Sequence, residues 1–138
     1  MAKRISHLGI AVKDLAASEA LFAKLLGDDH VHHEVVEDQG VSIASFNIGE
    51  SVIELTSPTS DDSAIAKFIA KRGEGIHHLA IEVDDVESEL ARLKTEGIQL
   101  IDDQAKPGAH NMLIAFLHPK STNGVLIELC QKNDYSKR

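Results

Sequence analysis

The chain has few cysteines, few basic residues and no long apolar run, and each shortage excludes a class of protein. One cysteine, Cys130, cannot form an intrachain disulfide and is typical of a reducing compartment. The formal net charge of -8 argues against a nucleic-acid partner, because phosphate backbones bind basic surfaces. No apolar run approaches the roughly 20 residues that a membrane span needs. We therefore expect a cytoplasmic protein that binds neither nucleic acid nor membranes.

An internal duplication is the most informative feature of the chain. The segment 7–15 is echoed at 78–86, so that His7 and His78 occupy matching places. Each echo is followed, at a similar distance, by an Ile-Glu-Leu tripeptide centred on Glu54 or Glu128. The 138 residues fit one domain, and no linker-like or low-complexity tract divides them. We interpret residues 1–138 as a single domain made of two related units.

Hydrophobic patterning predicts the order βαβββ in each half. Each predicted helix follows an aspartate that can cap it and ends near a glycine. The repeats are expected at about 4–57 and 76–131, joined by a helical connector at about 58–75. The predicted strands are 5–12, 30–36, 41–48 and 51–56 in the first half, and 76–83, 98–101, 112–117 and 125–130 in the second. Because each sheet alone would leave one face unburied, the sequence predicts an α+β fold in which the paired βαβββ modules form a curved, cleft-enclosing mixed sheet.

Four residues in matching places are candidate metal ligands: His7, Glu54, His78 and Glu128. Both glutamates lie between apolar neighbours, and an inward carboxylate on an apolar strand is costly without a partner. A divalent cation supplies that partner and takes neutral imidazole as a second type of ligand. The mixed donor set suits Zn²⁺, Co²⁺, Ni²⁺, Mn²⁺ or Fe²⁺, and an octahedral ion would keep two positions for a bidentate substrate. The alternative interpretation is two interior histidines and two solvent-facing glutamates.

Other titratable residues have simpler interpretations. The histidines at 30, 32 and 33 are expected on an exposed edge strand, because neighbouring strand residues point to opposite faces. By the same rule His77 points away from His78. Cys130 is expected to pack rather than to act as a nucleophile. A solvated helix face is expected for the charged residues of the second repeat's helix: Glu87, Glu89, Arg92, Lys94 and Glu96.

Several motifs spread over most of the chain resemble one enzyme family. The resemblance is carried by residues 7–12, 39–41, 63–68, 73–80, 83–85, 116–121 and 124–129. Together they resemble the vicinal-oxygen-chelate (glyoxalase-type) superfamily and, within it, the family of methylmalonyl-CoA epimerases. The blocks Gly75-Ile76-His77-His78 and His118-Pro119-Lys120-Ser121 are the more specific to the epimerases.

The resemblance implies an isomerase that interconverts (2R)- and (2S)-methylmalonyl-CoA in propionyl-CoA metabolism. It implies a divalent metal, Co²⁺ in assays with Zn²⁺, Mn²⁺, Ni²⁺ or Mg²⁺ as alternatives, and a homodimer. His7, Glu54, His78 and Glu128 match the family's metal positions, and the family accepts Gln or Glu at the place of Glu54. The metal would stabilise the enolate formed when the C2 proton leaves. Glu128 would act as one base while contacting the metal.

Inversion at C2 requires proton exchange on both faces of a planar intermediate, so a second base is needed. Some members of the family carry a carboxylate just after Gln-Gly-Val, whereas this chain has Ser42, Ile43 and Ala44 there. The substitute candidates are His110 and Glu37. An acidic protein that binds CoA phosphates also needs local cations, for which the candidates are Lys71, Arg72, Lys106 and Lys120.

Three other functions fit the same fold. A glyoxalase I-type isomerase (lactoylglutathione lyase) would act on methylglyoxal with glutathione. An extradiol dioxygenase would need Fe²⁺ held by two His and one carboxylate, which four balanced ligands argue against. A non-catalytic small-molecule-binding module, such as an antibiotic-sequestering protein, would bind without turnover.

Overall fold

A computed structural model describes residues 1–133, in which the chain forms two compact units. The N-terminal unit is His7–His77. The C-terminal unit combines Met1–Ser6 with the described residues from His78 onward. The boundaries fall inside strands β1 (Ala2–Ala11) and β5 (Gly75–Val83), so each of these strands runs from one unit into the other.

The N-terminal unit contains a four-stranded mixed sheet in the order β2-β3-β4-β1. Its elements after β1 are α1 (Leu15–Leu26), β2 (His32–Val36), the 3-10 helix η1 (Glu37–Gln39), β3 (Val41–Ile48), β4 (Ser51–Pro58) and α2 (Ala64–Arg72). β1 runs parallel to β4, while β2, β3 and β4 are antiparallel neighbours. The order of elements is βαβββ, as the sequence predicts.

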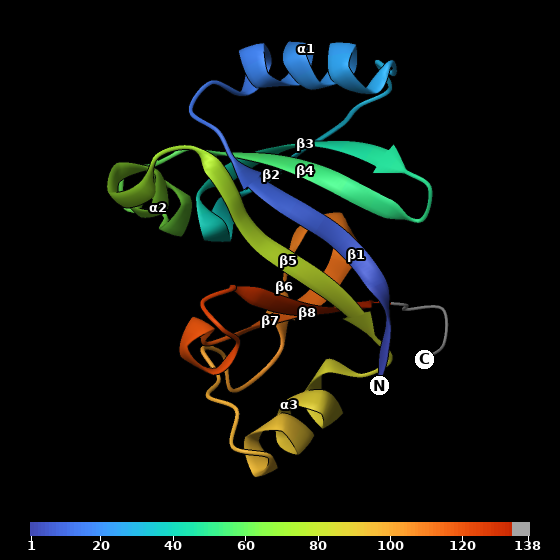
Figure 1. Ribbon diagram of the computed structural model, residues 1–138, viewed down its shortest axis with the longest axis vertical. Coiled ribbons are helices and arrows are strands. Elements are labelled where there is room, and N and C mark those ends of the chain that lie inside the picture. Colours follow the sequence, from blue (N-terminus) through green and yellow to red (C-terminus); the bar gives the residue numbers. More distant parts are fainter. Residues whose placement is uncertain (134–138) are drawn as a thin grey trace. The chain divides into compact units, whose positions relative to one another are not determined.

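Helix α1 covers one face of this sheet (Figure 1). The Asp14 side chain accepts a hydrogen bond from the Ala17 N–H at 3.1 Å, and Gly27 ends the helix with a φ of 68°. The strands present apolar residues to the helix: Val12, Ala44, Phe46 and Leu55 are buried there, with Leu15, Phe22, Ala23 and Leu26 packed against them. A burial of this kind is the main driving force for docking the helix.

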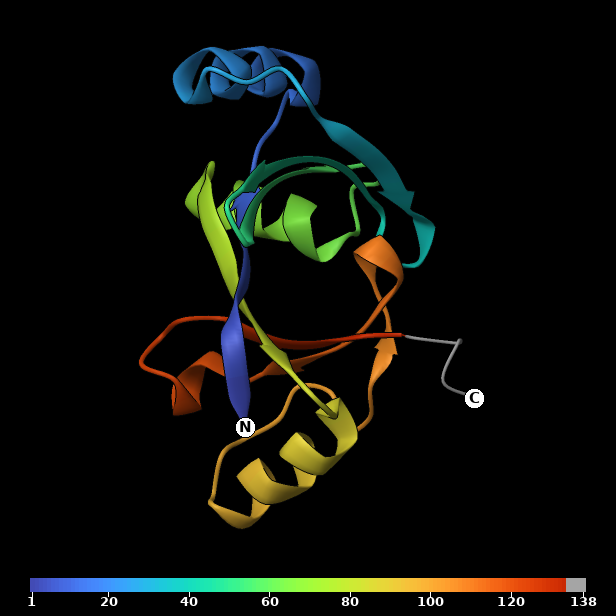
Figure 2. The same cartoon turned by 90° about the vertical axis from the view of Figure 1, so that its right-hand side faces the viewer.

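The C-terminal unit repeats the arrangement with the strand order β5-β8-β7-β6. Its elements after β5 are α3 (Val86–Thr95), β6 (Lys106–Pro107), η2 (Ala109–Asn111), β7 (Met112–Leu117), η3 (Pro119–Ser121) and β8 (Ile127–Lys132). β5 and β8 are parallel, and the other pairs are antiparallel. Figure 2 shows α3 lying against this sheet, where Val86 and Leu90 bury their side chains with Ala115, Leu117 and Leu129. The predicted α+β fold with mixed sheets is confirmed.

One predicted strand is wrong. Residues 98–101 form only an isolated bridge, Leu100 to Leu117, and the edge strand of the second unit is β6. The N–H groups of Ile101 and Asp102 both donate to the carbonyl of Phe116, at 2.9 and 3.2 Å. Because two successive donors share one acceptor, the ladder cannot advance and the strand stops.

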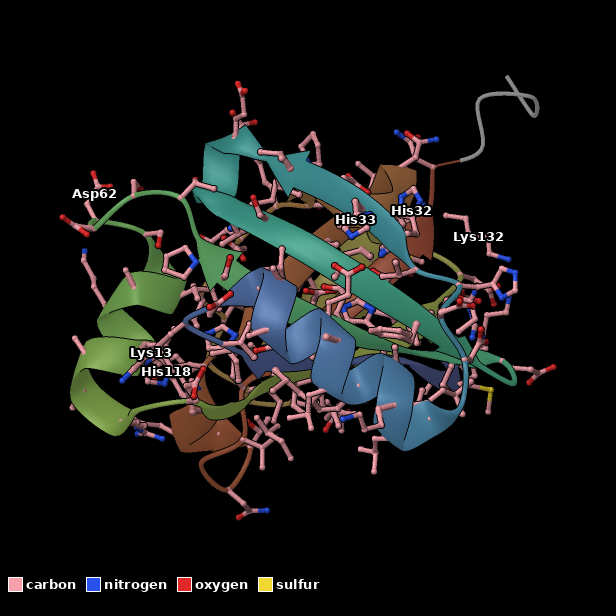
Figure 3. All side chains as sticks on the ribbon, turned by 90° about the horizontal axis from the view of Figure 1, so that it is seen from above. Lys13, His32, His33, Asp62, His118 and Lys132 are labelled. Atoms are coloured by element: carbon pink, nitrogen blue, oxygen red, sulfur yellow. The ribbon has the colours of Figure 1, made fainter. Side chains whose placement is uncertain are left out.

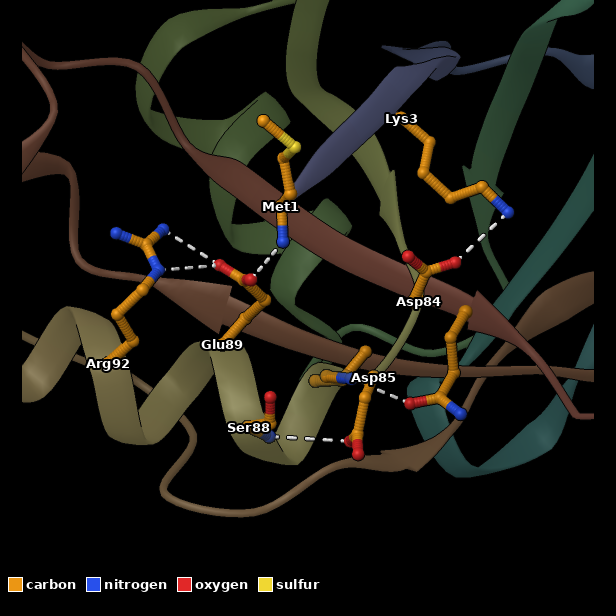
Figure 4. A network of polar contacts seen from close by, with 9 residues as sticks. Met1, Lys3, Asp84, Asp85, Ser88, Glu89 and Arg92 are labelled. Atoms are coloured by element: carbon orange, nitrogen blue, oxygen red, sulfur yellow. Dashed lines mark hydrogen bonds and ion pairs between the residues drawn. The ribbon is translucent and has the colours of Figure 1, made fainter.

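The expectation of a fully solvated face on α3 is also wrong. Glu89 is buried, and its carboxylate binds the N-terminal ammonium of Met1 and the guanidinium of Arg92 (Figure 4). The pKa of Glu89 is held below its ordinary value by these hydrogen bonds, the ammonium contributing most. The first strand of the chain is thereby tied to α3 of the same unit, a contact between residues far apart in sequence.

Among the helices formed by residues 1–133, none combines the length and the hydrophobicity that crossing a bilayer requires.

Candidate active site

In the N-terminal unit, His7 and Glu54 lie together on the sheet face opposite α1. β1 and β4 are parallel neighbours, and Glu54 is paired with Gly9, two residues along from His7. Leu55, next to Glu54, points to the helix side, so strand alternation turns the glutamate to the other face. The distance from His7 Nε2 to Glu54 Oε2 is 3.5 Å, and both side chains are buried.

The C-terminal unit contains an equivalent pair. His78 Nε2 lies 3.6 Å from Glu128 Oε1, and both side chains are buried on the sheet face opposite α3. The rings of His78 and Phe116 pack in a T-shaped arrangement, with the centroids 5.9 Å apart at an interplanar angle of 87°. Phe116 is the strand partner of Glu128, so the aromatic ring flanks the pair. Each unit therefore brings together one predicted histidine and one predicted glutamate.

The geometry of both pairs fits two ligands of one metal ion. The separations of 3.5 and 3.6 Å are longer than an ordinary hydrogen bond between nitrogen and oxygen. Two donors bound at about 2.1 Å to the same ion are separated by roughly 3.0 Å at a bond angle of 90° and by roughly 3.6 Å at about 118°. Imidazole with carboxylate is a donor set that transition-metal dications accept. Each pair can therefore supply one nitrogen and one oxygen to a divalent cation.

The candidates for a second base lie outside these pairs. Glu37 is exposed in η1. His110 is half-buried in η2, and its φ of 58° is unusual for a residue with a side chain. On β3, the segment Ser42–Ala44 carries no carboxylate. The base expected on this strand from the family pattern is therefore missing.

Cys130 has the properties of a packing residue. It is fully buried, and its thiol donates to the carbonyl of Ile81 at 3.6 Å. Burial raises the pKa of the Cys130 thiol to about 12. A thiol that stays protonated at neutral pH is a poor nucleophile, as the sequence predicts.

Among the predicted edge-strand histidines, His32 and His33 lie on β2, whereas His30 precedes the strand. The side chains of His30, His32 and His33 are exposed, and Figure 3 labels the last two on β2. His77 packs edge-on against Phe68 of α2, with centroids 4.9 Å apart. His77 is thus part of the packing between α2 and β5.

Sequence reasoning missed one residue on the sheet faces that carry the pairs, and it named a second only as one of four candidate cations. Glu34 on β2 lies on the same face as Glu54, a placement that the alternation His32, His33, Glu34 could have indicated. Lys106 lies over the ring of Phe116, with Nζ 5.5 Å from the centroid and 3.2 Å from Asp102 Oδ1. No local sequence signal distinguishes Lys106 from the other lysines.

Comparisons with known proteins agree with the motif resemblance. Residues 6–116 match the model of the Glyoxalase/Bleomycin resistance protein/Dioxygenase superfamily. The ethylmalonyl-CoA/methylmalonyl-CoA epimerase of Cereibacter sphaeroides is 38% identical over 95% of this chain and 99% of its own length. The crystal structure of methylmalonyl-CoA epimerase from Mycobacterium tuberculosis is 37% identical, with a TM-score of 0.92 over 99% of this chain and 92% of that one.

A third relative carries a ligand. A variant of the Streptomyces coelicolor methylmalonyl-CoA epimerase, solved in complex with 2-nitronate-propionyl-CoA, is 37% identical, with a TM-score of 0.90 over 96% of both chains. The predicted resemblance to the epimerases is confirmed.

Proposed function

Since the chain belongs to the Glyoxalase/Bleomycin resistance protein/Dioxygenase superfamily, we propose that it is an epimerase that inverts C2 of methylmalonyl-CoA. Epimerase relatives cover nearly the whole chain at 37 to 38% identity, and one of them is named for both ethylmalonyl-CoA and methylmalonyl-CoA. The observation that carries the proposal is the occurrence of one buried His–Glu pair in each unit. A carboxylate close to an imidazole, repeated in a duplicated chain, is suited to metal-assisted proton transfer.

The proposal assigns His7, Glu54, His78 and Glu128 as ligands of one divalent cation. Its support is the matched position of the residues in the two repeats and the Nε2–O separation within each pair. Co²⁺ is the ion of choice for assays, and Zn²⁺, Mn²⁺, Ni²⁺ and Mg²⁺ are the alternatives. When bound, the ion would supply Lewis-acid chemistry toward the thioester carbonyl oxygen and the substrate carboxylate.

Glu128 is proposed as one of the two proton-transfer groups. Its carboxylate lies on the sheet face where Met112, Ile114 and Cys130 are buried and Phe116 packs. An apolar surrounding of this kind excludes water and strengthens the interaction of the carboxylate with a nearby C–H proton. The C2–H bond is weakened by the neighbouring thioester and carboxylate groups, so a positioned carboxylate suffices as the base.

The proposal includes a homodimer in the cytoplasm and a CoA thioester as the small-molecule partner. A reducing compartment is supported by the single cysteine, which is buried. Apolar side chains available for a partner copy include Leu21 and Leu25 on α1, both more than half exposed.

The test is proton NMR of methylmalonyl-CoA in D₂O, first with metal-stripped protein and then with Co²⁺ added. We expect the C2 proton signal to disappear only after the metal is added. Conversion of the 2R to the 2S form is followed in parallel with a stereospecific mutase. The His78→Ala variant should fold, bind less metal and lose the exchange.

Two results would contradict the proposal. Full activity of metal-stripped His78→Ala would disprove the ligand assignment. Absence of exchange with every divalent metal would exclude the epimerase. Turnover of methylglyoxal with glutathione would then identify a glyoxalase I-type isomerase, and ligand binding without turnover would identify a binding module.

A further inference from the structure

The proposed reaction lacks a base, since β3 has no carboxylate at Ser42, Ile43 or Ala44. The strand next to β3 supplies one. We propose that Glu34 on β2 is the second proton-transfer group of the reaction, in addition to Glu128. This inference rests on the proposed epimerase function and completes it.

Glu34 lies on the same sheet face as Glu54. His33, its neighbour on β2, bonds Glu19 of α1, with His33 Nε2 2.7 Å from Glu19 Oε2. His33 therefore points to the helix side, and alternation along the strand turns Glu34 to the opposite face. That face is the one to which Glu54 points.

The register of the strands places Glu34 next to the missing carboxylate. Glu34 is paired with Ile43, which is the middle residue of the segment where a carboxylate is absent. Directly opposite residues of antiparallel strands have Cβ atoms about 5 Å apart, and a glutamate side chain extends by nearly that length. The carboxylate of Glu34 can therefore occupy the space above Ile43. In this proposal the glutamate on β2 takes the role of the carboxylate that some family members carry on β3.

A buried hydroxyl group lies in the same row of paired residues across the sheet. Ile43 is paired on its other side with Thr56, which is buried. Within residues 1–133, the Thr56 hydroxyl has no hydrogen-bond partner. A buried hydroxyl without a partner is uncommon and indicates an additional ligand or water at that place. The row Glu34–Ile43–Thr56 therefore has polar groups on both sides of an apolar residue, as expected where a polar substrate lies on the sheet.

His32 gives Glu34 a route to solvent. Its Nε2 is 3.7 Å from Glu34 Oε1, and the side chains of His32 and Glu34 are 62% and 28% exposed. This distance is too long for a direct hydrogen bond but can be bridged through one water. A base that has taken a proton must lose it before the next turnover in the same direction, and the imidazole can pass that proton to solvent.

The proton transfer balances without a further reactant. One carboxylate takes the proton from C2, and the electron pair of the C–H bond moves to the thioester oxygen to form an enolate. The carboxylic acid on the other face returns a proton to C2, and the electron pair comes back to carbon. Starting from one epimer, Glu34 is the base and Glu128 the acid, and the roles reverse for the other epimer. The thioester and the carboxylate of the substrate are unchanged.

The test compares exchange with inversion for both epimers in D₂O, using metal-loaded protein. In Glu34→Gln we expect epimerisation to fall by about 10²–10⁴-fold, the usual effect of removing a general base. One epimer should still exchange its C2 proton with retention of configuration, because Glu128 remains on one face. Glu34→Asp should keep inversion at a reduced rate. Glu50→Gln, at an exposed carboxylate in the turn between β3 and β4, is the matched control and should behave as wild type.

The possible outcomes separate the inference from the proposed function. Inversion at the wild-type rate in Glu34→Gln would overturn the assignment. So would an equal loss of exchange for both epimers together with a lowered Tm, since that result indicates a structural role. Exchange of one epimer with retention in His110→Ala, but not in Glu34→Gln, would assign the base to His110 instead. Absence of exchange in the wild-type protein would refute the epimerase itself, not merely the choice of base.

Discussion

Replacing Glu128 by Gln should have opposite effects on the metal-free and the metal-loaded protein. The carboxylate is buried beside the His78 imidazole, and glutamine has nearly the same shape without the charge. Burying an ionised carboxylate costs several kcal/mol, of which neighbouring groups return only part. We therefore expect the metal-free variant to be more stable than wild type by about 1–2 kcal/mol. For a domain of this size, that increase corresponds to a rise in Tm of about 3–6 °C.

With metal bound, we expect the wild type to be more stable than Glu128→Gln. At a free metal concentration of 100 times Kd, binding stabilises the wild type by about 2.7 kcal/mol. We expect the affinity of Glu128→Gln to be about 100-fold weaker, since even changes behind the ligands weaken metal sites by 10- to 100-fold. At the same concentration the variant then gains only about 0.4 kcal/mol. The stabilisation by metal should therefore shrink by about 2.3 kcal/mol.

Thermal unfolding with and without Co²⁺ tests both predictions: the higher Tm of the metal-free variant and its smaller stabilisation by metal. Glu54→Gln is the comparison variant, because the family accepts glutamine at that position and its loss of affinity should be smaller. If Glu128→Gln lowered the Tm of the metal-free protein and kept the full response to Co²⁺, Glu128 would be half of a structural ion pair with His78. The ligand assignment would then fail.

Four further predictions concern the rest of the molecule. Cys130 should resist alkylation at pH 8 in the native protein and react on unfolding, because its thiol pKa is about 12 and the side chain is buried; mass spectrometry measures the label. The pKa of Glu89 is lower in the folded protein than its ordinary value of 4.5, so the ionised side chain stabilises the fold. This stabilisation is complete above pH 4.5 and is lost as the pH falls through the pKa of the folded state. Urea unfolding between pH 6 and 3 should therefore show a shallower loss for Glu89→Gln than for wild type. Leu90→Ala should lower the free energy of unfolding by about 2–5 kcal/mol, since Leu90 is fully enclosed in the core beneath α3. In an NMR titration the pKa of His30 should lie above its ordinary value because its ring bonds Asp28, and Asp28→Asn should bring it down.

Local patterns in the sequence predicted most of the helices and strands and identified the residues of the two His–Glu pairs. Short apolar stretches bounded by turn-forming residues predicted β3 and β7 with their observed bounds, because a run of this kind indicates a buried strand. The duplication singled out His7, Glu54, His78 and Glu128. Their burial followed from apolar neighbours on the same strand, which is a local signal.

Only the tertiary structure decided which residues lie beside one another across strands. The edge strand at Lys106–Pro107 replaced the expected strand at 98–101, because two N–H groups compete for one carbonyl of β7. Glu89 became buried because the chain terminus reaches α3, a contact between distant residues that no local pattern encodes. The placement of Glu34 opposite Ile43 likewise depends on the register of β2 and β3. Register is set by the hydrophobic patterns of both strands together and by the geometry of the turn between them, whereas periodicity along one strand only tells which face a side chain takes.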